Sequence, residues 1–404
     1  MRRAATMVRL FALGLIPVAL LLSHRNLTVV TTLIALTAVP AVARGWRRVR
    51  LPRWAWPALT LAAYLAVSSL WTPSASDRDW GLRVPLFVLT ILAVIVAARG
   101  GSVREGRVFA LALLIACVLL GIEGLTGGLI RDVLPPPNAP DRDDVSTARG
   151  VGLAVAMLPG GAWWLCALYG RRGAWLAGGA AALLVVGAVR FGVAANALAL
   201  AASGAAALTA WRAPRAVATA GLHALTAGFV LGPVAASLLP PADALGELTT
   251  GPVSWRQRLV IWRTVADAAL GDPLVFLFGA GQQASTALGE AAGTIVIPGS
   301  PVPLPRVPTH PHSVFLQVWY EAGALGSALA AGALAMAARR VRQAALPDGV
   351  LVALAATLAG AFVSLAVDAS VWTLWRASAL MLAAWGLTLG ARTGQGVVHR
   401  PLGA

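Results

Sequence analysis

The sequence predicts an all-α protein that crosses a membrane many times, and three observations lead to this class. Of the 404 residues, 58% are hydrophobic and only 12% are charged. The mean hydropathy is +0.76. These values exclude a soluble globular protein of this length. Apolar runs of about 17–25 residues, long enough to cross roughly 30 Å of hydrocarbon, recur between short connections that carry Arg, Pro or Gly.

We predict about twelve transmembrane helices, with a large periplasmic loop before the tenth that carries a partly helical surface segment. The predicted spans are 7–22, 27–43, 54–71, 84–99, 108–127, 148–169, 174–189, 191–210, 216–239, 313–338, 350–367 and 370–391. Residues 188–191 contain no clear loop, so the seventh and eighth spans could instead form one broken hairpin. The N-terminal run resembles a signal peptide, but no A-x-A-like cleavage site follows it, and we expect it to remain as the first span.

Arginine carries all the positive side-chain charge, because the chain contains no lysine. Alternate connections are basic, and the positive-inside rule therefore places them, together with both termini, in the cytoplasm. That side holds twenty arginines against Glu105 and Asp348, whereas the remainder holds twelve arginines against fourteen acidic residues. The same rule explains the net charge of +16 without nucleic-acid binding, which we do not expect.

Two non-cytoplasmic connections are unusually long. The first, about 128–147, contains proline clusters that exclude a helix and favour a stiff extended loop. The second divides the chain into nine spans (1–239), a large periplasmic loop with catalytic residues (240–312), and three spans with a cytoplasmic tail (313–404). Because functional residues gather on loops held by a rigid scaffold, we expect the active site on this face.

Residues 254–270 of the large loop predict a helix with Ser254 as its N-cap. Its apolar stripe consists of Leu259, Trp262, Ala266 and Ala269. The other face is basic, and Arg256, Arg258 and Arg263 exclude a spanning helix, so we expect the segment to lie at the membrane surface. Arg256 and Arg263 could serve only to contact lipid headgroups.

Ionisable residues at membrane depth are costly, and each is therefore a functional candidate. Five lie within or at the edge of predicted spans, namely Glu123, Arg190, Glu321, Asp368 and Arg376. A purely structural role is open for each, such as an ion pair between Asp368 and Arg376 or snorkelling of Arg190.

His310 and His312 flank Pro311 where the large loop enters the tenth span. Histidine has an ordinary pKa near neutrality, so it can take a proton from a hydroxyl without strong tuning. Pro311 stiffens this entry, and we expect His312 to face the outer interface as a general base. The alternative is a histidine that faces headgroups or caps the helix. Two histidines without a third ligand make a metal site weak, and we predict none.

The residues from His310 onward carry a family resemblance. HPHSVFLQVWYEAGALG (310–326) resembles the HxHN-aromatic-Leu-Gln-x-x-x-Glu-x-Gly-x-x-Gly signature of the O-antigen ligase and O-antigen polymerase superfamily. RLVIW (258–262) with GDPLVFLFGAG (271–281) is similar to that family's Arg-x-x-x-Trp and Gly-x-Gly pattern. VRFGVAANALAL (189–200) resembles its Ser-Arg-Gly/Ala segment. The motifs fill about 190–326, and the remaining spans match by pattern alone.

The resemblance implies transfer of a finished O-antigen glycan from undecaprenyl diphosphate to a sugar hydroxyl of lipid A-core. The reaction would occur on the periplasmic face of a Gram-negative inner membrane, without cofactor, nucleotide or metal. His312 would activate the acceptor hydroxyl, which predicts inversion at the anomeric carbon. Arg190 and Arg258 would clamp the diphosphate, because guanidinium forks hold phosphate oxygens bidentately and stay charged. The supporting candidates for orienting His312 or the acceptor are His310, Glu321 and Asp368.

Two positions depart from the family pattern. Ser313 replaces the usual Asn after the histidine, and Val189 replaces the usual Ser before the arginine. Both are polar support positions, so the departures weaken the expected supporting contacts more than the roles of His312, Arg190 or Arg258.

Several other functions stay open at this point. An O-antigen polymerase, or a protein O-glycosylating relative, would use the same kind of donor and a different acceptor. A metal-dependent membrane glycosyltransferase is suggested by the acidic pairs at 77–79 and 141–143, since such enzymes hold a divalent cation with carboxylates. Twelve spans with intramembrane charges also suit a transporter or flippase, although the halves show no repeat.

Overall fold

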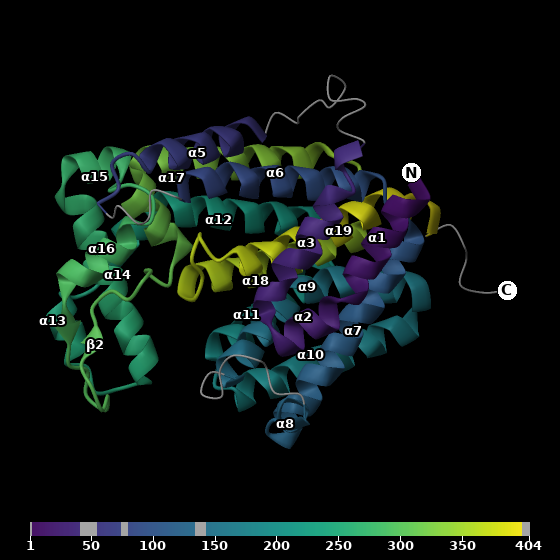
Figure 1. Cartoon of the computed structure of the whole chain (residues 1–404), viewed down its shortest axis with the longest axis horizontal. Helices are drawn as coiled ribbons and strands as arrows, with labels where there is room; N and C mark the ends of the chain where they lie inside the picture. Colours follow the sequence, from purple (N-terminus) through teal and green to yellow (C-terminus); the bar gives the residue numbers. More distant parts are fainter. Residues whose placement is uncertain (1, 41–54, 74–79, 134–142, 398–404) are drawn as a thin grey trace.

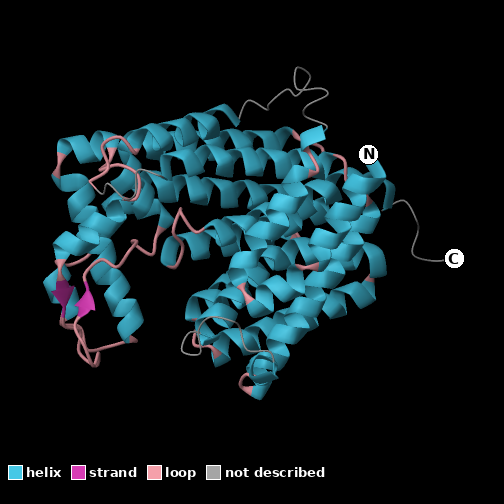
Figure 2. Cartoon of the chain, viewed as in Figure 1, coloured by secondary structure: helices cyan, strands magenta, loops and turns pink. Residues whose placement is uncertain are grey.

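The computed structural model describes residues 2–40, 55–73, 80–133 and 143–397, and nearly all of its regular structure is helical (Figure 2). About 81% of the described residues are helical. Seven of the described helices are long and apolar enough to cross a membrane. The predicted class, an all-α multi-pass membrane protein, is therefore confirmed at this level. The count of twelve spans and the periplasmic position of the large loop stay predictions.

Up to residue 237, the described residues form a series of helices (Figure 1). They are α1 (Arg2–Gly14), α2 (Ile16–Leu22), η1 (His24–Asn26), α3 (Leu27–Leu36), α5 (Ala55–Ser68), α6 (Trp80–Arg99), α7 (Val103–Thr126), α8 (Leu129–Val133), α9 (Asp143–Tyr169), α10 (Arg171–Arg190), α11 (Ala194–Ala210) and α12 (Pro214–Ser237). The apolar runs form long helices because a helix satisfies its own backbone hydrogen bonds, which is required in hydrocarbon, where no water is present.

The remainder begins with four helices and a two-stranded hairpin and ends with three long helices. They are α13 (Ala242–Gly246), α14 (Val253–Gly271), α15 (Pro273–Phe278), α16 (Ala284–Ala292), β1 (Thr294–Ile295), β2 (Leu304–Pro305), α17 (Val314–Gln343), α18 (Asp348–Val367) and α19 (Leu374–Val397). We call residues 240–312 the outer segment. It lies at the left of Figure 1, whereas α1 lies at the opposite end of the molecule.

Each predicted span coincides with helix in the described part of the chain, but the boundaries differ. The first predicted span consists of two helices, because α1 ends at Gly14 and α2 restarts at Ile16 with Pro17 in its first turn. The seventh and eighth are separate helices joined by a tight turn at Gly192, where φ is 64°. Their order along the sequence is therefore predicted better than their ends.

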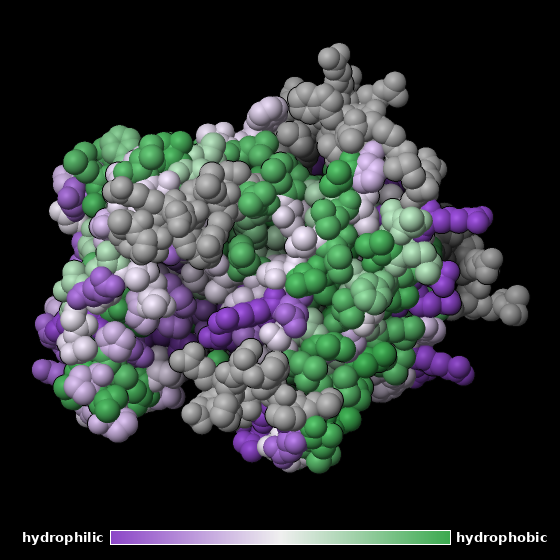
Figure 3. Space-filling model, viewed as in Figure 1, coloured by the Kyte–Doolittle hydropathy of each residue, from purple (hydrophilic) through white to green (hydrophobic). Residues whose placement is uncertain are grey.

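The helices pack into two neighbouring groups. α12 and α17 pack along each other, as do α11 and α18, while α9 contacts α7, α10 and α19. The largest core cluster joins α1 to α3 with α7, α9, α10 and α19, and it includes the fully buried Trp164 and Trp385. Hydrophobic side chains cover much of the bundle on the face shown in Figure 3, and hydrophilic side chains project at the end where α1 lies.

Helix α14 confirms the predicted helix at 254–270 but corrects its start and its surroundings. Pro252 occupies the N-cap position, and no side chain caps the helix, so Ser254 is not the cap. The apolar face does not lie free at the surface, because Ala266 and Ala269 are fully buried in a cluster with Leu316 of α17 and Ala236 of α12. The apolar face of α14 therefore packs against α12 and α17.

Two arginines of α14 are held by hydrogen bonds: Arg256 within the outer segment, and Arg263 to the end of α12. Arg256 is buried and donates to the carbonyls of Leu248 and Pro298, the latter at 2.7 Å. Arg263 donates to the Ser237 carbonyl at 2.7 Å and pairs with Asp267 at 2.9 Å. Of the alternatives left open by the sequence, these bonds contradict the one in which both side chains only contact lipid headgroups.

The connection predicted as an extended loop at 128–147 begins with a short helix instead. α8 covers residues 129–133, and the buried Glu123 carboxylate accepts from the backbone of Ile130 at 2.9 Å and from Arg131 Nε at 2.5 Å. Glu123 therefore has a structural role, because it links the end of α7 to α8. The proline cluster of this connection lies outside the described residues.

The middle of α17 is broken at Gly323, where φ is 64° and ψ is −167°. The break lets the carbonyls of Tyr320 and Glu321 accept from the backbone N–H groups of Ala280 at 2.7 Å and Gly281 at 3.1 Å. A Cβ on Gly323 would meet the Leu277 carbonyl oxygen at 2.5 Å. Only glycine allows this close approach. The Gly-x-Gly segment at 279–281 and the glycine-containing signature around Gly323 therefore pack against each other.

Candidate functional site

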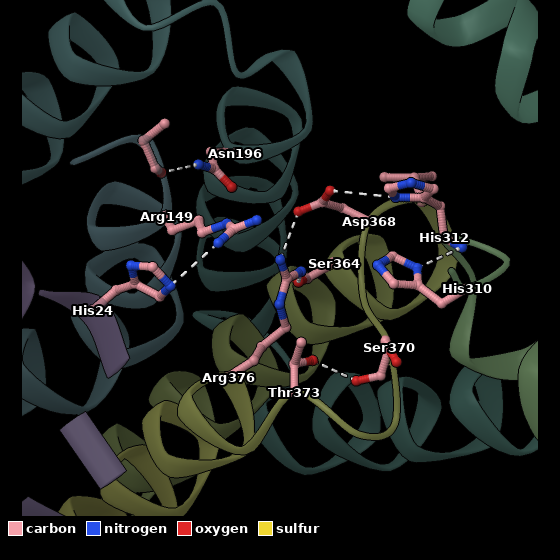
Figure 4. Close-up of polar contacts among 12 residues, drawn as sticks. His24, Arg149, Asn196, His310, His312, Ser364, Asp368, Ser370, Thr373 and Arg376 are labelled. Atoms are coloured by element: carbon pink, nitrogen blue, oxygen red, sulfur yellow. Dashed lines mark hydrogen bonds and ion pairs between the residues drawn. The ribbon is translucent and has the colours of Figure 1, made fainter. Parts of the chain in front are cut away.

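A cavity of about 340 Å³ opens where the outer segment meets the ends of α9, α11, α18 and α19. Its polar wall contains His310, His312, Asp368, Arg376 and Arg149 (Figure 4). Its apolar wall consists of side chains such as Leu153, Ala156, Phe191, Leu365 and Leu380. The site therefore joins a polar, cationic region to an apolar one, as an amphipathic ligand requires.

Asp368 is the centre of the polar wall. It follows the last residue of α18, and its carboxylate accepts from Arg376 Nη2 at 2.7 Å. Its other oxygen lies 3.7 Å from Arg258 Nη2 and 3.9 Å from His312 Nδ1. The predicted supporting residue thus connects an arginine of α14, an arginine of α19 and the predicted base.

His312 lies at the entry to α17 in a strained backbone conformation. Its φ is 53°, in the left-handed region that residues with a Cβ rarely adopt. Such strain costs roughly 1–3 kcal/mol and is found mainly where function requires it. The Nδ1 atom is buried, has no hydrogen-bond partner in the described chain and points toward Asp368 (Figure 4). This orientation favours a proton on Nδ1 and leaves Nε2 to accept another.

His310 supports that conformation directly. Its Nδ1 accepts from the backbone N–H of His312 at 3.2 Å, and the two rings meet edge to face at 4.3 Å between centroids. Since Nδ1 is the acceptor, the proton of the neutral ring is on Nε2. His310 therefore positions His312, which agrees with its predicted supporting role without testing it.

Burial keeps both imidazoles neutral. It is the largest cause that lowers the pKa of His312 to about 3, followed by His310 and Arg258, while Asp368 opposes the shift. Burial also lowers the pKa of His310 to about 4, with Asp368 again opposing. A neutral imidazole is the form that can accept a proton.

Arg258 and Arg376 reach Asp368 from different helices, and both are held in place. Arg258 Nε donates to the Val367 carbonyl at 2.7 Å, and its guanidinium carbon lies 5.4 Å from the centre of the Trp255 ring. Arg376 Nη1 donates to Ser364 Oγ at 2.9 Å. The proposed ion pair between Asp368 and Arg376 exists, and it forms part of the cavity wall.

Glu321 bonds to groups other than His312, and its predicted supporting role stays a prediction. The carboxylate is buried inside α17 and accepts from Ser285 Oγ at 2.7 Å, Gln317 Nε2 at 2.9 Å and Trp372 Nε1 at 2.7 Å. Gln317 in turn accepts from the Val371 backbone at 2.9 Å. Gln317 and Glu321 together hold residues 371 and 372, in the turn that follows Asp368. Glu321 therefore supports the backbone next to Asp368.

Arg190 is the last residue of α10 and is not among the residues that line the cavity. It is exposed in the last turn of α10, and its side chain makes no hydrogen bond or ion pair with the described residues. The next residue, Phe191, lines the cavity, whereas Arg190 itself does not. Its predicted contact with the diphosphate stays a prediction.

Three residues of the site were missed from the sequence, namely His24, Arg149 and Asn196. Arg149 and Asn196 line the cavity, and Asn196 donates to the Ala148 carbonyl at 3.1 Å. Arg149 carried a readable signal, because it stands at the N-terminal end of the sixth predicted span, where an arginine is costly. His24 had none, since its neighbours come from residues more than a hundred positions away.

The charge of the polar wall suits an anion. Arg258 and Arg376 lie at the Asp368 carboxylate, and Arg149 lines the same cavity, so with neutral histidines these three arginines and Asp368 carry two net positive charges. A glycosyl diphosphate is a dianion, and arginine forks bind phosphate oxygens well.

Metal binding has no visible ligand set in the described part of the chain, where no three His, Cys, Asp or Glu side chains come together. Of the acidic pairs considered for a cation, Asp77, Asp79 and Asp141 lie outside the described residues.

No family model, curated protein or solved structure matches the chain.

Proposed function

We propose that the protein is an O-antigen ligase, which transfers a finished glycan from undecaprenyl diphosphate to a sugar hydroxyl of lipid A-core. One observation carries the proposal: a neutral His312 beside the Asp368 carboxylate faces a cavity that combines arginines with an apolar wall. The proposed location is the periplasmic face of a Gram-negative inner membrane, with both termini in the cytoplasm.

In the proposed reaction, His312 Nε2 takes the proton of the acceptor hydroxyl, while Asp368 faces the protonated Nδ1 and stabilises the imidazolium that forms. The acceptor oxygen then bonds to the anomeric carbon from the face opposite the diphosphate. The bond between that carbon and the diphosphate oxygen breaks, and undecaprenyl diphosphate leaves with the electron pair. The stereochemistry is therefore inverted, and no nucleotide is needed because the donor is already activated.

The arginines stabilise the negative charge that grows on the leaving diphosphate. Arg258 and Arg376 already lie at the carboxylate of Asp368, and Arg190 would join them from the end of α10. A bound diphosphate raises the pKa of His312 from its low unliganded value, because a nearby anion favours the imidazolium. Donor binding thus makes the base stronger when a proton has to be accepted.

The apolar wall gives the lipid a place beside the charged groups. Leu153 and Ala156 of α9 and Leu380 of α19 line the cavity on helices of the bundle. A polyprenyl chain can follow such a surface toward hydrocarbon, while the glycan stays in water. The acceptor, lipid A-core, would approach from the same side.

The test is a deletion of the gene followed by an electrophoretic lipopolysaccharide profile. A ligase mutant loses the whole O-antigen ladder and accumulates lipid-linked polymer. Core carrying a single repeat would mean a polymerase, and loss of lipid-linked polymer from the outer face would mean a flippase. Complementation with His312→Ala should leave the ladder absent although the protein is inserted.

A further inference from the structure

A second histidine lies behind the cavity wall. His24, in the η1 turn between α2 and α3, is buried, and its ring packs edge to face on Trp375 at 4.8 Å between centroids. Its Nδ1 lies 3.1 Å from Ser146 Oγ, and its Nε2 lies 3.4 Å from Arg149 Nη1. The N-terminal hairpin thus reaches an arginine that lines the cavity.

The hydrogen-bond partners of His24 define which ring nitrogen carries the proton. A guanidinium only donates hydrogen bonds, so Nε2 must be the acceptor and Nδ1 must carry the proton, which it donates to Ser146. Burial, with Arg149 next, lowers the pKa of His24 to about 4, so this neutral form is the stable one. A protonated ring would place two cations against each other.

Arg149 is held on two sides and directed at the cavity. Its guanidinium carbon lies 5.6 Å from the centre of the Trp375 ring, and Nη1 contacts His24. Figure 4 shows Arg149 on the side of Asp368 opposite the two histidines. A guanidinium has five N–H donors, so it can contact His24 and still bind an anion.

We propose that Arg149 binds a phosphate group of the lipid-diphosphate donor from the wall opposite His312, and that His24 is the positioning residue that aims it. The inference rests on the proposed function for the identity of the donor. It places the diphosphate between α9, α18 and α19, with the leaving oxygen and the base on different sides of the reacting carbon.

The experiment measures binding of farnesyl diphosphate, a short prenyl diphosphate, to the purified full-length protein by calorimetry. Arg149→Gln should weaken binding about 10- to 150-fold, as expected when one charge-assisted hydrogen bond to an anion is lost. His24→Leu should weaken it about 5-fold or more, because Arg149 loses the hydrogen bond to His24 Nε2. His24→Gln should restore most of the affinity, since its amide oxygen can accept from Arg149.

The matched control is Arg25→Gln, which removes a positive charge from the exposed neighbour of His24. It should leave the affinity unchanged within about 2-fold, because exposed charges are screened. Thermal unfolding in detergent is measured for every variant. If His24→Leu and His24→Gln weaken binding equally with a lower melting temperature, His24 is only structural and its positioning role is wrong.

Two outcomes separate this inference from the proposed function. Unchanged binding in Arg149→Gln, or no binding of farnesyl diphosphate by the unaltered protein, overturns the anion site. Binding that depends on Arg149 in a protein that transfers no glycan to lipid A-core supports the anion site and overturns the ligase function.

Discussion

Replacing Asp368 by Asn should separate donor binding from chemistry. The change keeps the size of the side chain but removes the one carboxylate that faces Arg258, Arg376 and His312. The arginines then lose their internal competitor for phosphate, so the KM for the donor should stay the same or fall. His312 loses the charge that stabilises its protonated form, so kcat should decrease.

The distances set the size of the loss. Two unit charges 3.9 Å apart, the separation of His312 Nδ1 and Asp368 Oδ1, interact by about 4 kcal/mol at an effective dielectric constant of about 20. Both side chains are 29% exposed. Solvent screening therefore reduces the contribution to about 2 kcal/mol, which corresponds to about 30-fold in kcat.

The assay follows glycan transfer by purified protein from an undecaprenyl-diphosphate-linked donor to lipid A-core, with kcat and KM obtained separately. Asp267→Asn is the matched control, because Asp267 also pairs with an arginine of α14 but lies outside the cavity. The control should keep the parental kcat. An unchanged kcat in Asp368→Asn, or a loss confined to KM, would show that Asp368 does not act through His312.

Four further outcomes are expected. Because burial lowers the pKa of His312 to about 3, kcat/KM should stay level from about pH 8 to pH 5. As the pH is lowered, kcat should decrease before kcat/KM does, because the bound diphosphate raises the pKa of His312. A decrease in kcat/KM with an apparent pKa near 6.5 would contradict this. Glu321→Gln should lower the melting temperature by several degrees, because it breaks buried hydrogen bonds, whereas the exposed Glu290→Gln should not. Transfer should survive a divalent-metal chelator; complete loss restored by added cation would favour the metal-dependent class. Arg258→Lys should reduce donor affinity clearly, because the fork is lost, and a matching loss in Arg190→Lys would show that Arg190 joins the same anion.

Hydropathy predicted the helices well, because segment length and apolar composition are local properties that the membrane enforces. It could not predict the break at Gly323 or the restart at Ile16, which depend on contacts with distant segments and on one proline. The small helices α13, α15 and α16 were missed for a different reason. They have five, six and nine residues, which is too short to show a helical period.

The candidate site shows the same division. His312, His310, Asp368 and Arg258 were named from the sequence, and the fold brings them together. The partners of Glu321 could not be predicted, because Ser285 and Trp372 lie 36 and 51 positions away and no local pattern reveals them.

Residue Arg149 shows how a readable signal was overlooked. It stands at the edge of an apolar span, as Arg190 does, yet only Arg149 lines the cavity. Sequence reasoning identifies which charges are costly at membrane depth. It does not tell which of them share one cavity, because that depends on how separate helices pack.

The most direct measurement of the central claim is the anomeric configuration of the product made by the purified protein from an undecaprenyl-diphosphate-linked glycan and lipid A-core, without nucleotide. The account predicts a glycan joined to the core sugar with inverted configuration, and no product from His312→Ala. Retention of configuration, or transfer by His312→Ala at the parental rate, would contradict it.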